Sequence, residues 1–215
     1  IALYNSTSAL LGWDQETYMP RKGAPTRGRQ LATLSGMAHT RFISEEMSDA
    51  IEGARSEELN ADQQVNLREI VRSHERASKL PTRLVKALAE TSSASIEVWM
   101  QARENNDFPS FAPWIEKLVN LQKESAEAIG YEREPYDALL DEYEPGASTQ
   151  EIAGVFESLR GPTVDLVQRI KTSGITPRTD FLRKNYPIED QRQFGIMVSR
   201  QMGFDFEAGR LDTSP

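Results

Sequence analysis

The sequence predicts an all-α protein, with roughly six to eight helices arranged in antiparallel hairpins. Three observations favour this fold class. Apolar residues recur at helical spacing in most segments, and residues that start or stop helices separate those segments. No stretch of useful length alternates apolar and polar residues as a strand would. Short connections between helices place neighbours antiparallel, so we treat residues 1–215 as a single helical region.

The first predicted helices lie before residue 43. Residues 1–11 have helical character and lead into Gly12–Pro20, a block dense in aromatic and carboxylate side chains that Pro20 ends. Gly23-Ala24-Pro25 opens the next helix, which runs to about Phe42 because proline is well tolerated in a first turn. Its predicted inner face comprises Leu31, Leu34 and Ala38.

Capping residues divide the middle of the chain. Ser44 opens a short helix, and Asn60–Asp62 opens a longer one that Leu80-Pro81 ends. A further helix runs from Thr82 to Asn105, and its centre, Thr91–Ser95, is unusually small and hydroxylated. We favour close approach of another helix as the explanation, with a polar cleft wall as the alternative.

A corner joins this helix to the next one. Asn105-Asn106-Asp107 leaves the helix, since these side chains compete for backbone groups. Pro109 is expected to hold Phe108 in an extended conformation, and Ser110 to cap the new helix. That helix is expected to end at Gly130.

The last third of the chain contains three predicted helices. A short one covers about residues 136–140, and Ser148 with Glu151 forms a capping box for a long one. Pro162 should kink the long helix. A loop then leads to a helix that begins at Pro187. The predicted inward face of that helix comprises Phe194, Met197, Val198 and Met202.

Composition excludes several classes of protein. The net charge of −8 argues against a nucleic-acid partner, and no apolar run approaches the ~20 residues that span a membrane. The absence of cysteine excludes disulfides and thiolate metal sites, and favours a cytoplasmic location. Residues 132–157 hold eight acids against one arginine. We favour a solvated acidic face for this segment over a cation or peptide site.

The sequence contains no recognisable catalytic or metal-binding motif. The two histidines, His39 and His74, lie outside any recognisable motif, and a structural or surface role is favoured for each. His74-Glu75 begins like His-Glu-x-x-His, but Ser78 stands at the fifth position, so this segment cannot bind zinc by itself. A carboxylate-dependent hydrolase that uses Asp14 or Glu16 is a third-ranked hypothesis.

Five blocks, in order across nearly the whole chain, point to a family. They are Trp13–Pro20, Arg27–Leu34, Trp99–Pro113, Tyr136–Gly146 and Gly203–Asp212. Together they resemble the carboxypeptidase Taq family of thermostable metallocarboxypeptidases, which remove C-terminal residues from peptides. The resemblance implies an all-α, clefted fold similar to that of neurolysin. It further implies that residues 1–215 are the N-terminal part of such an enzyme, forming the lid and one wall of the substrate cleft.

The resemblance also implies cofactor and partners. In that family zinc, or cobalt, sits on a His-Glu-x-x-His helix completed by a downstream Glu. None of these ligands maps onto this sequence, so no catalytic and no metal-binding residue is expected here, and the chain is predicted to be inactive alone. The expected partners are a peptide substrate, the C-terminal catalytic part and a second copy in a homodimer.

Within the chain, substrate contacts are assigned to Trp13, Asp14, Gln15 and Met19. The alternative, which we weight equally, is that this block is a packed corner. A different class of function also stays open, namely a stand-alone helical binding or regulatory module without catalytic activity.

Overall fold

The structure is a computed structural model, and it describes residues 1–213. Within these residues it contains nine α-helices, two short 3₁₀ helices and no strand, which confirms the all-α prediction with one helix more than expected. None of the described helices is long and apolar enough to cross a membrane. The chain divides into two compact units: unit 1 is Ile1–Glu151, and unit 2 begins at Ile152.

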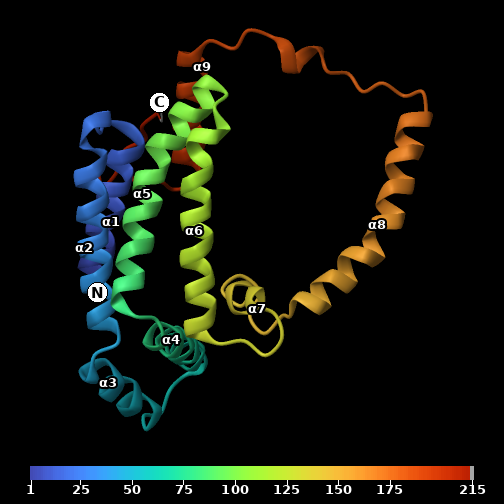
Figure 1. Ribbon diagram of the computed structural model, residues 1–215. Coiled ribbons are helices and arrows are strands. Elements are labelled where there is room, and N and C mark those ends of the chain that lie inside the picture. The colour runs from blue at the N-terminus through green and yellow to red at the C-terminus, as the bar shows by residue number, and fades with distance from the viewer. Residues whose placement is uncertain (214–215) are drawn as a thin grey trace. The chain divides into compact units, whose positions relative to one another are not determined.

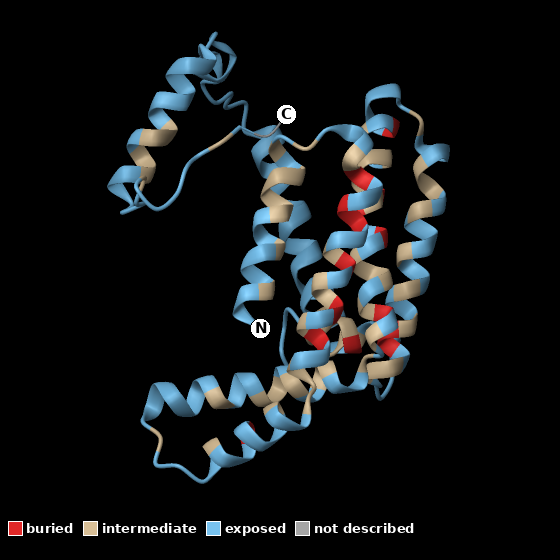
Figure 2. Ribbon diagram, turned by 90° about the vertical axis from the view of Figure 1, so that its left-hand side faces the viewer, coloured by how far each residue is buried: buried red, intermediate tan, exposed pale blue. Residues whose placement is uncertain are grey.

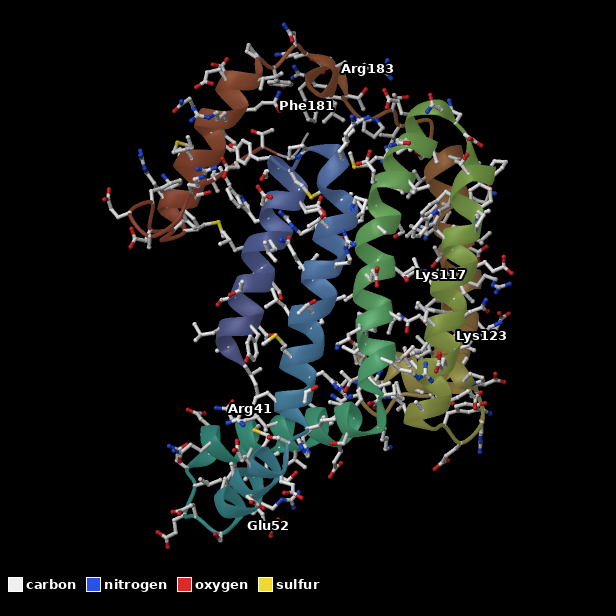
Figure 3. The ribbon with its side chains drawn as sticks, turned by 60° about the vertical axis from the view of Figure 1, so that its left-hand side comes forward. Arg41, Glu52, Lys117, Lys123, Phe181 and Arg183 are labelled. Atoms are coloured by element: carbon white, nitrogen blue, oxygen red, sulfur yellow. The ribbon has the colours of Figure 1, made fainter. Side chains whose placement is uncertain are left out.

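Four long helices form the body of unit 1. They are α1 (Ala2–Thr17), α2 (Ala24–Phe42), α5 (Thr82–Asn105) and α6 (Phe108–Ile129). In Figure 3 they lie side by side in the order α1, α2, α5 and α6, and each runs antiparallel to its neighbour. The predicted antiparallel hairpins are therefore present. The 3₁₀ helix η1 (Arg21–Gly23) joins α1 to α2.

Three further helices of unit 1 lie at one end of the four long helices, below them in Figure 1. They are α3 (Glu45–Arg55), α4 (Ala61–Lys79) and α7 (Pro135–Leu140). The predicted caps of the first two are confirmed. The Ser44 hydroxyl accepts the Met47 N–H at 3.3 Å, and Asn60 and Gln63 exchange side chain–backbone hydrogen bonds of 3.0 and 2.9 Å. Each cap satisfies N–H groups that a helix start leaves unpaired.

The core of unit 1 lies between α2 and α5, where small residues let the helices approach closely. Every fourth residue of one α2 face is small and buried: Ala24, Gly28, Ala32 and Gly36. On α5, Thr91, Ser93 and Ser95 are buried, as the favoured explanation of this segment requires, and Ser93 is the one that lies against Gly28 of α2. Figure 2 shows the buried residues gathered along these neighbouring helices. A Cβ atom added to Gly28 would lie 3.5 Å from the Glu90 carbonyl oxygen.

The predicted inner face of α2 is therefore displaced from the observed one. Leu31, Leu34 and Ala38 are only half-buried. The reason is that α5 lies against the smallest residues of α2 rather than its leucines: Gly28 faces the Glu90 backbone and Ser93, and Gly36 faces the Lys86 side chain. The largest fully buried side chain of the described residues is Leu84, at 0% exposure near the start of α5.

The corner between α5 and α6 differs from the prediction in its capping residue. Asn106 adopts a left-handed conformation, with φ of 52°, and ends α5. Asp107, not Ser110, then caps α6: its carboxylate accepts the Ser110 N–H at 3.4 Å and also the Ser110 hydroxyl. Phe108 is the first helical residue rather than extended. Pro109 fits the second helical position because a first turn leaves that N–H unpaired anyway.

Other helix ends follow the prediction. Gly130 ends α6 with φ of +84°, a conformation that favours glycine. The capping box of α8 (Thr149–Thr172) is present: Ser148 N–H donates to Glu151 at 2.9 Å, and Glu151 N–H donates to the Ser148 hydroxyl at 3.3 Å. The helix contains Pro162 in its interior, and Figure 1 shows α8 changing direction along its length.

Unit 2 also contains η2 (Asp180–Arg183) and α9 (Ile188–Gln201). The predicted inward face of α9 is wrong for three of its four residues. Phe194, Met197 and Met202 are 64, 47 and 83% exposed, and Val198 is half-buried. Periodicity identifies an apolar face, but the surface that would cover it is not found among the described residues of unit 2, none of which is buried.

Candidate functional site

The block from Trp13 to Met19 forms the last turns of α1 and its exit. The carbonyl oxygen of Asp14 accepts the N–H groups of Tyr18 and Met19, at 2.9 and 2.8 Å. The Thr17 hydroxyl donates to the Trp13 carbonyl at 2.7 Å. These hydrogen bonds satisfy carbonyl groups that the helix end leaves unpaired, and they fix the direction in which the chain enters η1.

Asp14 holds a buried guanidinium in place. Its carboxylate lies 2.5 Å from Nη2 of Arg27, whose side chain is only 10% exposed, while that of Asp14 is 36% exposed. Arg27 also donates from Nη1 to the Leu11 carbonyl and from Nε to Gln30 Oε1, at 3.2 Å for the latter. A buried charge is tolerated when it is paired and hydrogen-bonded in this way. The group of contacts ties α1 to α2.

Gln15 makes a second connection, from α1 to α5. Its Oε1 accepts a hydrogen bond of 2.8 Å from the hydroxyl of Ser93, which is buried. Ser93 belongs to the small hydroxylated segment of α5. Its short side chain lets α1 and α2 approach α5 and also supplies the donor that Gln15 needs when it is partly buried.

The two apolar members of the block contact neighbours in sequence. The rings of Trp13 and Tyr18 meet edge to face, with centroids 5.7 Å apart. The side chain of Met19 lies over Gly23, where an added Cβ would come within 3.3 Å of Met19 Cγ. All four predicted residues therefore have protein contacts, as a packed corner would. Whether any of them also contacts a peptide stays a prediction.

Two residues of this cluster were not anticipated. Arg27 and Ser93 complete the contacts of Asp14 and Gln15, yet neither was assigned a role in advance. A signal for Arg27 did exist. It follows Ala24 by three residues and precedes Gly28 on what becomes the buried face of α2, and an arginine on such a face needs an acidic partner.

A cavity opens directly after the block, between α2 and α5. Its volume is about 640 Å³, within the range that holds small ligands or peptide segments. Three cations and two carboxylates line it, together with apolar side chains that include Trp114 of α6. The charged residues are Arg21, Lys22, Arg29, Glu90 and Glu97. Arg21 Nε lies 3.8 Å from Glu97 Oε1. The rim therefore carries one cation in an ion pair, Arg21, beside Lys22 and Arg29.

A lysine of α6 packs on the tryptophan that lines this cavity. Lys117 and Lys123 project from α6 in Figure 3, and Lys117 Nζ lies 5.8 Å from the centroid of the Trp114 ring. A cation over an indole face is a stabilising contact at a surface. Trp114 is thereby held between the cavity and the solvent.

Several acids of segment 132–157 are hydrogen-bonded within the protein. Asp141 accepts the Gly146 N–H at 2.9 Å and a hydrogen bond of 2.7 Å from Arg72 of α4. The Gly146 amide, followed by Arg72, lowers the pKa of the Asp141 carboxyl below its ordinary value. Asp137 accepts from Thr149, whose hydroxyl is the main cause that lowers the pKa of Asp137. These acids stabilise the turn that follows α7. We therefore favour a role at the helix end for them.

The histidines take part in structural contacts. His39 is buried, and its Nδ1 and Nε2 lie 3.0 Å from the Thr82 hydroxyl and 3.0 Å from the Ala77 carbonyl. It thus connects α2 to the corner between α4 and α5. His74 packs edge-on against Phe42, with ring centroids 5.7 Å apart. Among residues 1–213 no group of three or more His, Cys, Asp and Glu side chains is placed to bind a metal.

Solved structures define the class of protein to which this fold belongs. The chain is similar to the crystal structure called BsuCP, with a TM-score of 0.88 and 30% identity, over 98% of this chain and 43% of that one. It is also similar to an M32 carboxypeptidase from Deinococcus radiodurans R1, with a TM-score of 0.75 and 31% identity, over 98% of this chain and 42% of that one. The class is that of all-helical carboxypeptidases.

The whole chain, residues 1–215, matches the carboxypeptidase Taq (M32) metallopeptidase family and belongs to it. It is 36% identical to thermostable carboxypeptidase 1 of Thermus thermophilus over 221 residues, which covers 96% of this chain and 43% of that protein. The chain therefore spans less than half the length of this relative. The resemblance inferred from five sequence blocks is confirmed.

Proposed function

We propose that this chain is the N-terminal part of a metal-dependent carboxypeptidase that releases C-terminal residues from peptides. The observation that carries the proposal is the family match over every residue of the chain, combined with its coverage of 43% of thermostable carboxypeptidase 1. In this proposal residues 1–215 form the lid and one wall of the substrate cleft. They are inactive without the remainder of the enzyme.

The metal belongs to the remainder of the enzyme in this proposal. The described residues do not fit a metal site, since no cluster of ligands is present and both ring nitrogens of His39 already have partners. No step of the hydrolysis is therefore assigned to this chain. A zinc or cobalt ion bound elsewhere would supply the polarisation of water and of the peptide carbonyl.

The chain's own contribution would be to position a peptide and to exclude water. The cavity between α2 and α5 has apolar walls for side chains, and Lys22 and Arg29 offer N–H donors to carbonyl or carboxylate oxygens. The contacts of Asp14 and Gln15 to α2 and α5 give this wall rigidity. A rigid wall places a substrate reproducibly, which is where positioning residues contribute to rate.

Two proteins from the same gene test this proposal: the full-length product and residues 1–215, each with verified mass. We expect metal and release of C-terminal residues from a blocked peptide only with the full-length product. Release by residues 1–215 alone would overturn the proposed division of labour. A gene product that ends at residue 215, and binds peptides without cleaving them, would instead support the stand-alone binding module.

The role of the Trp13–Met19 block needs a separate experiment in the full-length enzyme. If Trp13 contacts substrate, Trp13→Ala raises KM with little change in Tm. Tyr18→Ala is the matched control, because it removes the ring that packs on Trp13 and leaves Trp13 itself in place. Equal changes in KM for both variants would favour the packed corner over substrate contact.

The remaining parts of the proposal follow the family resemblance, for the homodimer, and the composition, for the cellular location and the excluded nucleic-acid partner. We propose a homodimer, a cytoplasmic location and no nucleic-acid partner. Sedimentation of the full-length enzyme at several concentrations measures the first, and fractionation of the source cells measures the second. The net charge of −8 and the absence of cysteine support the last two proposals.

A further inference from the structure

One side of α8 carries a stripe of large apolar side chains that are exposed. Its members stand three, four or seven residues apart, so they share one face of the helix, with Pro162 and Thr163 between its two halves. The α8 stripe comprises Val155, Phe156, Leu159, Leu166, Val167 and Ile170. They are 42 to 64% exposed, and none of the residues of α8 is buried.

The opposite face of α8 is mostly polar: it carries Glu157, Asp165 and Gln168, with the exposed Val164 beside them. The helix is therefore two-sided, as helices are that cover a core on one side. From Val155 to Ile170 the stripe extends over about 22 Å at the helical rise of about 1.5 Å per residue. An apolar strip of this length marks an interaction surface rather than scattered surface residues.

Unit 2 does not provide a cover for this stripe. None of its described residues, 152–213, is buried, whereas unit 1 holds every buried residue of the described chain. The helix α9 and the segment η2 likewise expose large apolar side chains, including Phe194 and Leu182. A unit without a core of its own needs apolar surface from another part of a polypeptide to become stable.

We infer that the α8 stripe is the docking surface for the segment of the full-length enzyme that lies beyond the region matched here. This inference rests on the proposed function, because it requires that the gene encode such a segment. The relatives support its existence: BsuCP matches 98% of this chain, yet more than half of BsuCP lies outside the match. The occupant is then one or more helices with an apolar face, which pack by interleaving side-chain ridges and grooves.

A second copy of the chain is the competing occupant, and two features favour the covalently linked segment. Five of the six stripe residues are aliphatic and only Phe156 is aromatic, whereas aromatic residues and arginine are enriched where separate proteins meet. A segment of the same polypeptide is also present at a high effective concentration, so it reaches the stripe before a second molecule does.

The absence of cysteine from this chain allows a direct experiment. In the full-length protein, Leu159→Cys places a thiol in the stripe, and Gln168→Cys places one on the polar face as the matched control. The maleimide labelling rate of each thiol is compared between native and urea-unfolded protein, with the labelled peptide identified by mass spectrometry. We expect native Leu159→Cys to react at least about tenfold more slowly than unfolded protein, and Gln168→Cys to react at similar rates in both.

Two results would overturn the inference. Fast labelling of native Leu159→Cys would show that nothing covers the stripe. Labelling that slows with rising concentration of residues 1–215 alone would show that a second copy covers it. Hydrogen exchange of α8 in the unsubstituted full-length protein makes the same comparison if Leu159→Cys does not fold. A protected stripe in a protein that releases no C-terminal residues would contradict the proposed function and leave the docking surface in place.

Discussion

Helices α5 and α8 have the same length, 24 residues, but opposite surroundings. In unit 1, α5 has five buried residues, and four of them are small: Thr91, Ser93, Ser95 and Ala102. In unit 2, α8 has larger apolar residues, and none of them is buried. The smaller side chains are covered because α2 and α6 both pack against α5, while the larger ones find no neighbouring helix within unit 2.

The difference shows that an apolar pattern and a core are separate properties. A helical pattern indicates which face of a helix needs a partner, and only the arrangement of the chain decides whether that partner is present. Unit 1 supplies partners for the facing sides of α2, α5 and α6. Unit 2 supplies none for the apolar faces of α8 and α9, so the two units should respond differently to equivalent substitutions in residues 1–215.

The largest expected difference concerns leucine. Leu84→Ala in α5 removes a side chain with no exposure and should cost about 2 to 5 kcal/mol of unfolding free energy, because it leaves a cavity. Leu159→Ala in α8 should cost less than about 0.5 kcal/mol, since that side chain is half exposed. Urea unfolding followed by circular dichroism measures both. Equal losses would contradict the assignment of the core to unit 1.

Ion pairs provide the second test. Arg27→Met leaves Asp14 and the Leu11 carbonyl without their donor and should cost about 2 to 3 kcal/mol. Arg178→Met removes a pair with Asp180 that is exposed on both sides, and no measurable change is expected. The same unfolding experiment, repeated at high salt, should preserve the Arg27 effect. If salt abolished it, the pair would be solvated rather than buried.

A smaller effect is expected for hydrogen bonds between a ring and its neighbours. His39→Phe keeps an aromatic ring but removes the contacts to Thr82 and Ala77, and should cost about 1 to 2 kcal/mol. In unit 2, Tyr186→Phe removes a hydrogen bond of 2.6 Å to the Phe181 carbonyl, which water can replace at this exposed site. Thermal unfolding should separate the two variants, and a larger loss for Tyr186→Phe would reverse the comparison.

The smallest expected effect is the pH dependence that Asp141 contributes. The Gly146 amide and Arg72 lower the pKa of this carboxyl below its ordinary value, so its folded pKa lies below its unfolded one. Its stabilising contribution is complete above that unfolded value and is lost as the pH falls through the folded pKa. Asp141→Asn should therefore lower stability at neutral pH and flatten the loss in acid.

The control for this measurement lies in unit 2. Arg178 lowers the pKa of Asp180 in the same direction, but the pair is exposed, so added salt should remove its contribution. Unfolding curves at low and high salt, from neutral to acid pH, distinguish the two carboxylates. If the stability change caused by Asp180→Asn did not depend on salt, the Arg178–Asp180 pair would be buried rather than exposed.

Local chemistry was enough to predict most helix boundaries. Ser44, Asn60, Gly130 and Ser148 each mark a helix end where they were expected, because a cap depends on residues within a few positions of it. The exception is Asp107. Both it and Ser110 can cap a helix, and the choice between them depends on how the chain leaves α5.

Contacts between distant residues were not predictable in the same way. The pairing of Asp14 with Arg27, and of Gln15 with Ser93 across 78 positions, depends on the row of helices that brings them together. The exposed face of α9 shows the reverse case. Its pattern required a covering surface, and a pattern cannot say which part of a polypeptide supplies one.

The spacing of small residues along α2 also limits how this part of the molecule can move. Ala24, Gly28, Ala32 and Gly36 seat α2 on α5 at one-turn intervals, so sliding by less than a turn would bring side chains into collision. Helices α2 and α5 should therefore move together as one rigid body. Movement within unit 1 would bend at non-helical joints, such as residues 56–60 between α3 and α4, rather than between α2 and α5.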